Sequence, residues 1–182
     1  APQFSFTRLH GSDCVLGVDM LSTGEVGCIG SSIDDALLKS MLSVGYKTPS
    51  KGVLLSTGDS VSKNEMLNVC RLLYDKGIKL FATYGTYEFL LSTGIESTLV
   101  YWPNDARQPN VKDHIINKDV DLVINIPKSL DREELSNDYI IRSEAIKNNI
   151  SVIANTKLSI AFIKACCVVS VDELCIKSSD EY

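Results

Sequence analysis

From residue 51 onward, short apolar runs alternate with helical patterns, and this alternation constrains the fold more than any other feature of the chain. Runs of four to six residues rich in Val, Ile and Leu are typical of strands buried in a parallel sheet. The runs are GVLLST (52–57), IKLFAT (78–83), STLVY (97–101), DLVINI (121–126) and SVIA (151–154). Helical patterns follow them at 62–76, 86–92, 110–118, 137–148 and 156–165. The sequence therefore predicts an α/β fold with an open, doubly wound, parallel five-stranded sheet.

Capping residues predict where two of these helices begin. Ser62 with Glu65 three residues later has the spacing of a capping box, so a helix is expected to start at Ser62 and to stop at Gly77. A hydroxyl residue, Thr86, is expected at the start of the next helix.

The first 47 residues follow a different pattern. Short strand-like pieces surround Ser22, and a helix is expected from about Ile33 to Val44, followed by a linker, GYKTPSKG. This stretch is too short to fold alone and is interpreted as the tail of a preceding domain. We therefore expect two parts, residues 1–47 and residues 48–182.

Composition excludes several classes of function. The chain of 182 residues is 45% apolar, has a net charge of −5, and shows no cluster of Lys and Arg, so nucleic acid is not expected as a partner. No apolar stretch approaches the ~20 residues that span a bilayer, so no membrane association is expected. The six cysteines have neither metal-ligand spacing nor the density of a disulfide-stabilised secreted domain, which predicts reduced thiols in the cytoplasm or the mitochondrial matrix.

Ligands of open parallel sheets bind at the carboxyl ends of the strands, where the sequence places polar residues. Thr83 and Thr86 bracket Gly85 at a strand end and a helix start, a combination that suits a phosphate or a carboxylate. The alternative is that Thr83 only ends a strand and Thr86 only caps a helix. Candidate ligand-binding residues at this edge are Ser56, Lys63, Thr83, Gly85, Thr86, Trp102, Asn125, Lys128, Asn155 and Thr156.

Groups that could perform catalysis are sparse. His10 and His114 have no Ser or Cys nucleophile in a plausible relation to them, and both are interpreted as surface or structural residues. The acidic residues form no recognisable metal-binding pattern. We expect no catalytic residue, no metal and no cofactor in these 182 residues.

The motifs resemble the large chain of carbamoyl phosphate synthetase. The stretch FSFTRLHGSDCVLGVDMLSTGEVGCIG resembles the end of its second ATP-grasp unit, although Asp19 stands where that family has Glu. The remainder resembles its carboxyl-terminal allosteric domain, which has a methylglyoxal-synthase-like fold. The segments that carry this second resemblance are SIDDALLKSMLSVGYKTPSKGVLLS, KLFATYGT, TLVYWP, DLVINIP, NDYIIRSEAI and IANTKLSIAFIKA.

The resemblance implies a regulatory role. Thr83 and Thr86 would hold the anionic group of an effector, with Trp102, Asn125, Ser56 and Lys63 at effector-side positions. The partners would be a small anionic effector and the rest of the synthetase large chain, whose own reaction uses ATP and Mg²⁺ to make carbamoyl phosphate from bicarbonate and ammonia or glutamine.

Two effector classes remain open. TLVYWP and the short connection from Pro127 to Tyr139 favour N-acetyl-L-glutamate, the effector of the urea-cycle type, over a pyrimidine nucleotide such as UTP or UMP. Lys128 and Asp138 depart from the asparagines of the acetylglutamate type, which keeps the nucleotide as the alternative.

Two further hypotheses belong to other classes. A methylglyoxal-synthase-type lyase would need a catalytic carboxylate, and Asp105 is the one candidate for it in PNDAR. A structural assembly surface would show no response to ligands. The effector-binding hypothesis is preferred over both.

Overall fold

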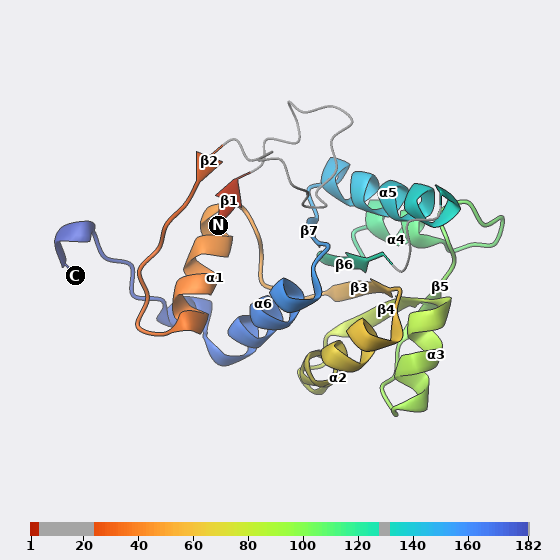
Figure 1. Ribbon diagram of the computed structural model, residues 1–182, viewed down its shortest axis with the longest axis horizontal. Coiled ribbons are helices and arrows are strands. Elements are labelled where there is room, and N and C mark those ends of the chain that lie inside the picture. The colour runs from red at the N-terminus through yellow and green to blue at the C-terminus, as the bar shows by residue number, and fades with distance from the viewer. Residues whose placement is uncertain (4–23, 128–131, 182) are drawn as a thin grey trace.

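A five-stranded parallel sheet is the centre of the molecule (Figure 1). The computed structural model describes residues 1–3, 24–127 and 132–181, and the side chains of 132–135 and 179 are not described. The elements in chain order are β1 (Pro2–Gln3), β2 (Gly24–Glu25), α1 (Ile33–Ser43), β3 (Gly52–Thr57), α2 (Ser60–Asp75), β4 (Lys79–Thr83), α3 (Tyr84–Ser92), β5 (Thr98–Val100), α4 (Val111–Ile116), β6 (Leu122–Ile126), α5 (Arg132–Lys147), β7 (Ser151–Ile153) and α6 (Thr156–Val168), followed by two short 3₁₀ turns, Val171–Glu173 and Ser179–Glu181.

The strand order confirms the predicted doubly wound topology. The sheet runs β5-β4-β3-β6-β7, so the chain moves outward from β3 to β5 and then returns to the other side of β3 for β6 and β7. All four strand pairings are parallel. The switch point therefore lies between β3 and β6, where the loops that follow these two strands diverge.

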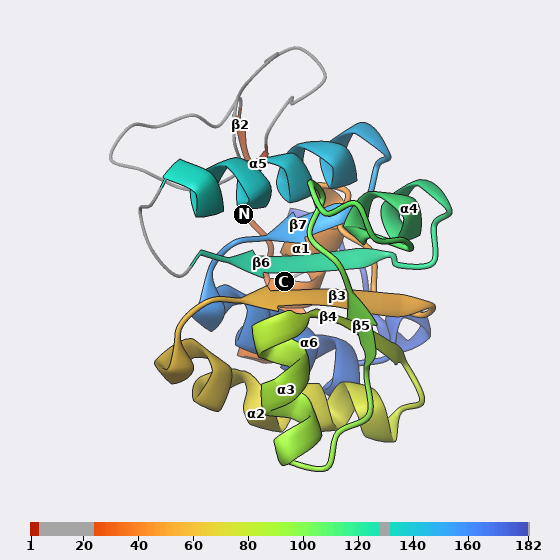
Figure 2. The same cartoon turned by 90° about the vertical axis from the view of Figure 1, so that its right-hand side faces the viewer.

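Two helical layers cover the sheet. Figure 2 shows α4 and α5 on one face and α2, α3 and α6 on the other. Alternate residues of β3 point to opposite faces of the sheet. Leu54 packs in the apolar cluster under α4 and α5, with Ile115 and Ile141. Leu55 packs in the cluster on the other face, with Leu73 of α2 and Phe162 of α6. Strands of a sheet covered on both faces are apolar throughout, which is why their runs were recognisable in the sequence.

Three helices begin earlier than predicted. α2 starts at Ser60 because the carboxylate of Asp59 accepts a hydrogen bond from the backbone N–H of Ser62 at 2.7 Å, so Asp59 is the cap and the prediction of Ser62 was wrong. α3 starts at Tyr84, directly after β4, which places Thr86 in the first turn rather than at the cap. α5 starts at Arg132 instead of near residue 137.

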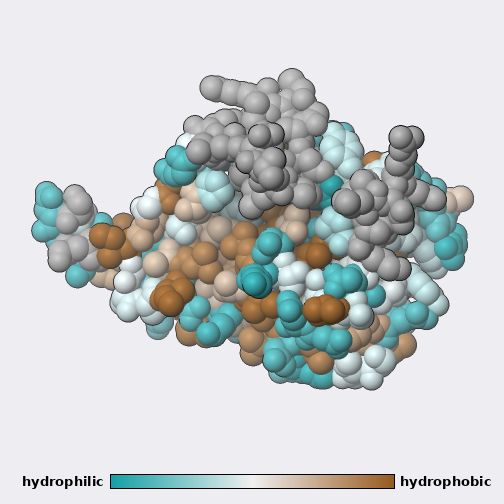
Figure 3. All heavy atoms as spheres, in the orientation of Figure 1, coloured by the Kyte–Doolittle hydropathy of each residue, from teal (hydrophilic) through white to brown (hydrophobic). Residues whose placement is uncertain are grey.

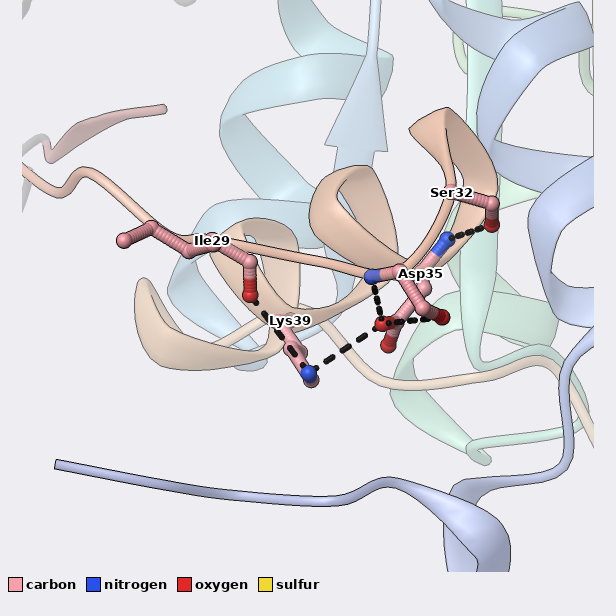
Figure 4. Close-up of polar contacts among 5 residues, drawn as sticks. Ile29, Ser32, Asp35 and Lys39 are labelled. Carbon is pink, nitrogen blue, oxygen red and sulfur yellow. Dashed lines mark hydrogen bonds and ion pairs between the residues drawn. The ribbon is translucent and has the colours of Figure 1, made fainter. Parts of the chain in front are cut away.

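The start of α1 is fixed by a local polar cluster (Figure 4). Ser32 caps the helix by accepting the N–H of Asp35 at 3.1 Å, and the Asp35 carboxylate accepts the N–H of Ser31 at 2.7 Å. Lys39 donates to the same carboxylate at 3.2 Å. Gly30 lies so close to the helix that a Cβ there would be 2.4 Å from the backbone nitrogen of Ala36. The chain can therefore turn into α1 only with glycine at this position.

α1 packs into the same apolar cluster as the sheet. Leu38 and Met41 are buried with Phe162 of α6. Tyr46, which follows α1, donates its hydroxyl to the backbone oxygen of Val152 in β7 at 2.8 Å. These contacts attach α1 to the sheet-containing part, while the boundary near residue 47 and the assignment of residues 1–47 to an ATP-grasp unit stay predictions.

Exposed apolar side chains gather near α1 and the segment that follows α6. Figure 3 shows apolar surface on this side of the molecule. The residues are Ile29, Ile33, Val168, Val171 and Ile176. Within the described residues, no helix combines the length and the apolar character that a membrane span requires.

Candidate functional site

Three polar side chains form a row across the carboxyl ends of neighbouring strands. Ser56 of β3 is paired in register with Asn125 of β6, and the hydroxyl of Thr83 in β4 donates to the Ser56 hydroxyl at 3.3 Å. Each lies two residues beyond an apolar residue that packs with α4 and α5, so the row faces the same side of the sheet. All three are at most 3% exposed. The structure thus brings together three of the residues predicted for the site.

The Thr86 hydroxyl is engaged by the main chain of β3. It donates to the backbone oxygen of Thr57 at 3.1 Å and accepts the backbone N–H of Thr57 at 3.0 Å. Both residues are buried, so this pair of hydrogen bonds ties the first turn of α3 to the end of β3. The role of Thr86 toward an effector stays a prediction.

The amino terminus of α3 lacks the side-chain cap that other helices possess. Thr83 is its N-cap residue and makes no capping hydrogen bond. By contrast, α1, α2, α4 and α6 are capped by Ser32, Asp59, Asn110 and Asn155. A helix start without a cap leaves N–H donors and positive potential for another acceptor.

Lys63 brings a positive charge to this helix start. Its ammonium donates to the backbone oxygen of Gly85 at 3.0 Å, and a Cβ built on Gly85 would lie 3.3 Å from the same nitrogen. This hydrogen bond is exposed, so both the anion-site role of Lys63 and the alternative of a solvated helix lysine stay predictions. Lys63 and Gly85 meet at the uncapped first turn of α3.

Asn125 is held by two charged residues of α5. Its amide nitrogen donates to Asp138 at 2.7 Å, and its amide oxygen accepts from Arg142 at 2.6 Å. Asn125 is fully buried, and Asp138 and Arg142 are each 2% exposed. Arg142 was not predicted as a site residue, although its spacing of four from Asp138 places both on one face of a helix.

The remaining residues predicted for the site differ in their contacts. Asn155 caps α6 by accepting the N–H of Leu158 at 3.0 Å. Thr156 donates to Ser62 of α2 at 3.1 Å, so the starts of α2 and α6 are adjacent. Trp102 is half-buried and packs against the apolar cluster under α4 and α5. Lys128 lies outside the described residues.

Asp105, the carboxylate considered for a lyase, is held by Arg107. The guanidinium donates to both carboxylate oxygens, at 3.0 and 2.6 Å. These hydrogen bonds from Arg107 lower the pKa of Asp105 to about 2. A carboxylate of this pKa is a weak base at neutral pH, and it is not protonated there to act as an acid.

His114 lies in the protein interior and contacts other side chains there. It is buried against Phe81 with ring centroids 4.8 Å apart, and its Nδ1 lies 2.8 Å from Asp119. His10 lies outside the described residues. The part of the chain that the structure describes holds no group of three His, Cys, Asp or Glu residues that could bind a metal.

Two hollows lie away from this edge, near the carboxyl end of α6. Their volumes are about 370 and 500 Å³, and they share Val168, Val169 and Glu173. One is lined by Cys166 and Cys167. Burial raises the pKa of both thiols, that of Cys166 to about 12, so they are protonated at neutral pH and the hollow offers no reactive thiolate.

Comparisons with known proteins place the sequence in context. Residues 65–154 match the family model described as "MGS-like domain". The chain is 39% identical to part of the multifunctional protein URA2 of Saccharomyces cerevisiae, and 37% identical to part of the multifunctional protein CAD of Squalus acanthias; each match covers 90% of the chain. It is 36% identical, over 91% of its length, to part of a mitochondrial carbamoyl-phosphate synthase (ammonia) of Rattus norvegicus. The chain spans 8%, 8% and 11% of these three proteins. The matches confirm the resemblance to an MGS-like domain and to part of a carbamoyl-phosphate synthase. The resemblance of the first residues to an ATP-grasp unit stays a prediction.

Proposed function

Because the chain contains an MGS-like domain and is similar over nine tenths of its length to part of a carbamoyl-phosphate synthase, we propose that it is the allosteric effector-binding region of such an enzyme. One observation carries the proposal. The first turn of α3 has no side-chain cap, and the Lys63 ammonium lies beside it on Gly85. Backbone N–H groups together with a lysine are the donors that bind one phosphate or carboxylate group.

The proposed effector is a small anion with a second polar part. Its anionic group would bind at Lys63 and the start of α3, while Ser56, Thr83 and Asn125 would face the rest of the molecule, with Trp102 alongside. N-acetyl-L-glutamate is the preferred effector, and a pyrimidine nucleotide is the alternative. Occupancy would alter the equilibrium between states of a longer synthetase chain, which would itself use ATP and Mg²⁺.

The cysteines support a reducing compartment, and we propose the mitochondrial matrix or the cytoplasm. The five cysteines that the structure describes are all free thiols. The fragment itself is proposed to be non-catalytic, because Asp105 is fixed by Arg107 and His114 is buried in a structural contact.

A thermal-unfolding panel tests the effector-binding proposal. N-acetyl-L-glutamate, UTP, UMP, IMP and inorganic phosphate are added separately to the chain at millimolar concentration. A ligand at 100 times its Kd stabilises the native state by about 2.7 kcal/mol. For a chain of this size the corresponding rise in Tm is roughly 5–10 °C.

The Gly85→Ala variant identifies the site. Its Cβ would be 3.3 Å from the Lys63 ammonium, so the lysine must shift within the anion site. Alanine is compatible with the helical backbone at this position, and replacing glycine there should raise the free energy of unfolding by about 0.5–1 kcal/mol. The flexible end of the lysine need move only by a few tenths of an ångström, so we expect a smaller ligand-induced rise in Tm in this variant, while its own Tm is unchanged or higher.

The matched control is Gly27→Ala, because a Cβ at Gly27 would have no neighbour within 4 Å. It should keep the wild-type response. The proposal fails if no compound raises the Tm of the wild-type chain, or if Gly85→Ala responds as fully as Gly27→Ala.

A further inference from the structure

We propose that Asp138 and Arg142 are positioning residues that fix the side-chain amide of Asn125 in one orientation, so that the buried row beside the proposed site holds a hydrogen-bond donor at this position. The consequence for an effector rests on the proposed function. The orientation itself is a property of the ligand-free protein, and it can be tested separately.

The two ends of the amide face opposite charges. The Asp138 carboxylate can only accept hydrogen bonds, and it accepts from the amide nitrogen at 2.7 Å. The Arg142 guanidinium can only donate, and it donates to the amide oxygen at 2.6 Å. Rotating the amide by 180° would place its oxygen against the carboxylate and its NH₂ group against the guanidinium. Both contacts would then be repulsive, so one orientation is strongly preferred.

Burial of the three side chains strengthens the preference for one amide orientation. Asn125 is 0% exposed, and Asp138 and Arg142 are 2% exposed, so water cannot replace either partner after a rotation. The two α5 residues are four apart and reach the amide from the same helix. α5 lies over β6 in Figure 2, which brings this helix face onto the strand that carries Asn125.

When the orientation of the Asn125 amide is fixed, the direction of its second N–H is fixed as well. One N–H of the amide nitrogen is used by Asp138, and the second N–H is directed by the same fixed geometry. Asn125 belongs to the row with Ser56 and Thr83 and is itself 0% exposed, so this N–H is a donor inside the buried row. A carbonyl, carboxylate or phosphate oxygen of an effector would have to enter the row to accept from it. Arg142 is proposed to act through Asn125, to whose amide oxygen it donates.

The principal test is the double variant Asp138→Asn with Arg142→Gln, which keeps hydrogen-bonding groups and removes both charges. In ¹⁵N-resolved NMR of the ligand-free chain, the two Nδ2 protons of wild-type Asn125 should differ widely in shift and exchange slowly with solvent. In the double variant the neutral amides at 138 and 142 accept either orientation, so the difference in shift between the two Nδ2 protons should become smaller. A structural role alone would change stability without reorienting this amide.

The affinity for the best-binding compound among N-acetyl-L-glutamate and UMP provides the second measurement. We expect it to fall about tenfold in the double variant, a factor that corresponds to one charge-assisted hydrogen bond. Arg142→Lys keeps the charge without the planar donor geometry and should show a smaller loss. Lys147→Gln removes an exposed cation from the same helix and serves as the matched control with wild-type affinity.

The outcomes separate the two proposals. If the wild-type amide is fixed but no compound binds, the proposed function fails and the positioning role stands. If the folded double variant keeps the wild-type amide signals and affinity, the positioning role is overturned. Should the double variant not fold, Asp138→Asn alone is measured in the same way, and unchanged amide signals there overturn the inference.

Discussion

Replacing Thr86 with valine tests whether its hydroxyl joins α3 to β3. The substitution keeps the branched shape of the side chain and removes the oxygen. In the wild-type chain this oxygen donates to the carbonyl of Thr57 and accepts the N–H of Thr57, at 3.1 and 3.0 Å. Valine therefore leaves both backbone groups without this partner.

The expected loss is large because the position is buried. Thr86 and Thr57 are 4% and 5% exposed, so water has little access to the two backbone groups. An unpaired buried polar group costs about 1–3 kcal/mol, which gives about 2–6 kcal/mol for the two together. A domain is typically stable by roughly 5–15 kcal/mol, so the variant should fold but be clearly weakened.

Urea unfolding followed by circular dichroism measures the effect. With a slope of about 2 kcal/mol per molar, the midpoint should fall by roughly 1–3 M. Thr93→Val is the control, because Thr93 is the C-cap residue of α3 and its hydroxyl donates locally, to the Leu90 oxygen of that helix at 2.8 Å. If both variants lower the free energy of unfolding equally, or if Thr86→Val changes it by less than about 0.5 kcal/mol, the structural role of the hydroxyl is refuted.

Two other predictions follow from the pKa shifts. The Asp59 pKa is lowered because the side chain and the backbone N–H of Ser62 donate to its carboxylate. The ionised carboxylate therefore stabilises the folded chain fully at pH values above the unfolded-state pKa of about 4. This stabilisation is lost as the pH falls through the lowered pKa of the folded state. Asp59→Asn keeps a capping acceptor and should flatten this acid dependence of Tm. Burial raises the pKa of the Cys70 and Cys166 thiols to about 12, so iodoacetamide should label exposed Cys175 first at pH 8. In urea, peptide mass spectrometry should find all three labelled, and equal labelling in the native state would contradict the assigned burial.

The strands were predictable because both faces of the sheet are buried. Five continuous apolar runs have the length of strands, and the chirality of parallel crossovers leaves few arrangements for them. The same topology predicted that residues after β3, β4 and β6 meet at one edge. Ser56, Thr83 and Asn125 do so because strand register places equivalent positions side by side.

Helix starts were less predictable because several residues compete to cap them. Near α2 both Asp59 and Ser62 are suitable caps, and the chain uses Asp59, so that Ser62 is free to accept from Thr156 of α6. At α3 the cap position is taken by Thr83 only because β4 runs directly into the helix. Local sequence rules rank such candidates, and packing between distant helices selects among them.

The hydrogen-bond network around Asn125 could be predicted from the sequence only in part. Charged residues four apart on a helix usually form an exposed pair, so Asp138 and Arg142 had no sequence signal of burial. Their burial results from the packing of α5 on β6, where a single buried amide can satisfy both an acceptor and a donor. Asn125 was identifiable as a polar residue within an apolar strand, and its partners had to lie on whichever helix covers that face.

The two threonines around Gly85 look equivalent in sequence, and the structure gives them different contacts. Thr83 ends β4 and shares a hydrogen bond with another hydroxyl, that of Ser56, and hydroxyls can exchange donor and acceptor roles when a ligand arrives. Thr86 is bound to a backbone N–H and a backbone carbonyl, whose roles are fixed. An anion that recruited Thr86 would have to break the attachment of α3 to β3, whereas one that recruits Thr83 and the N–H groups of the first helical turn would leave it intact. We therefore expect the proposed effector to bind at Thr83, Gly85 and Lys63, and Thr86 to keep the helix start in place for them.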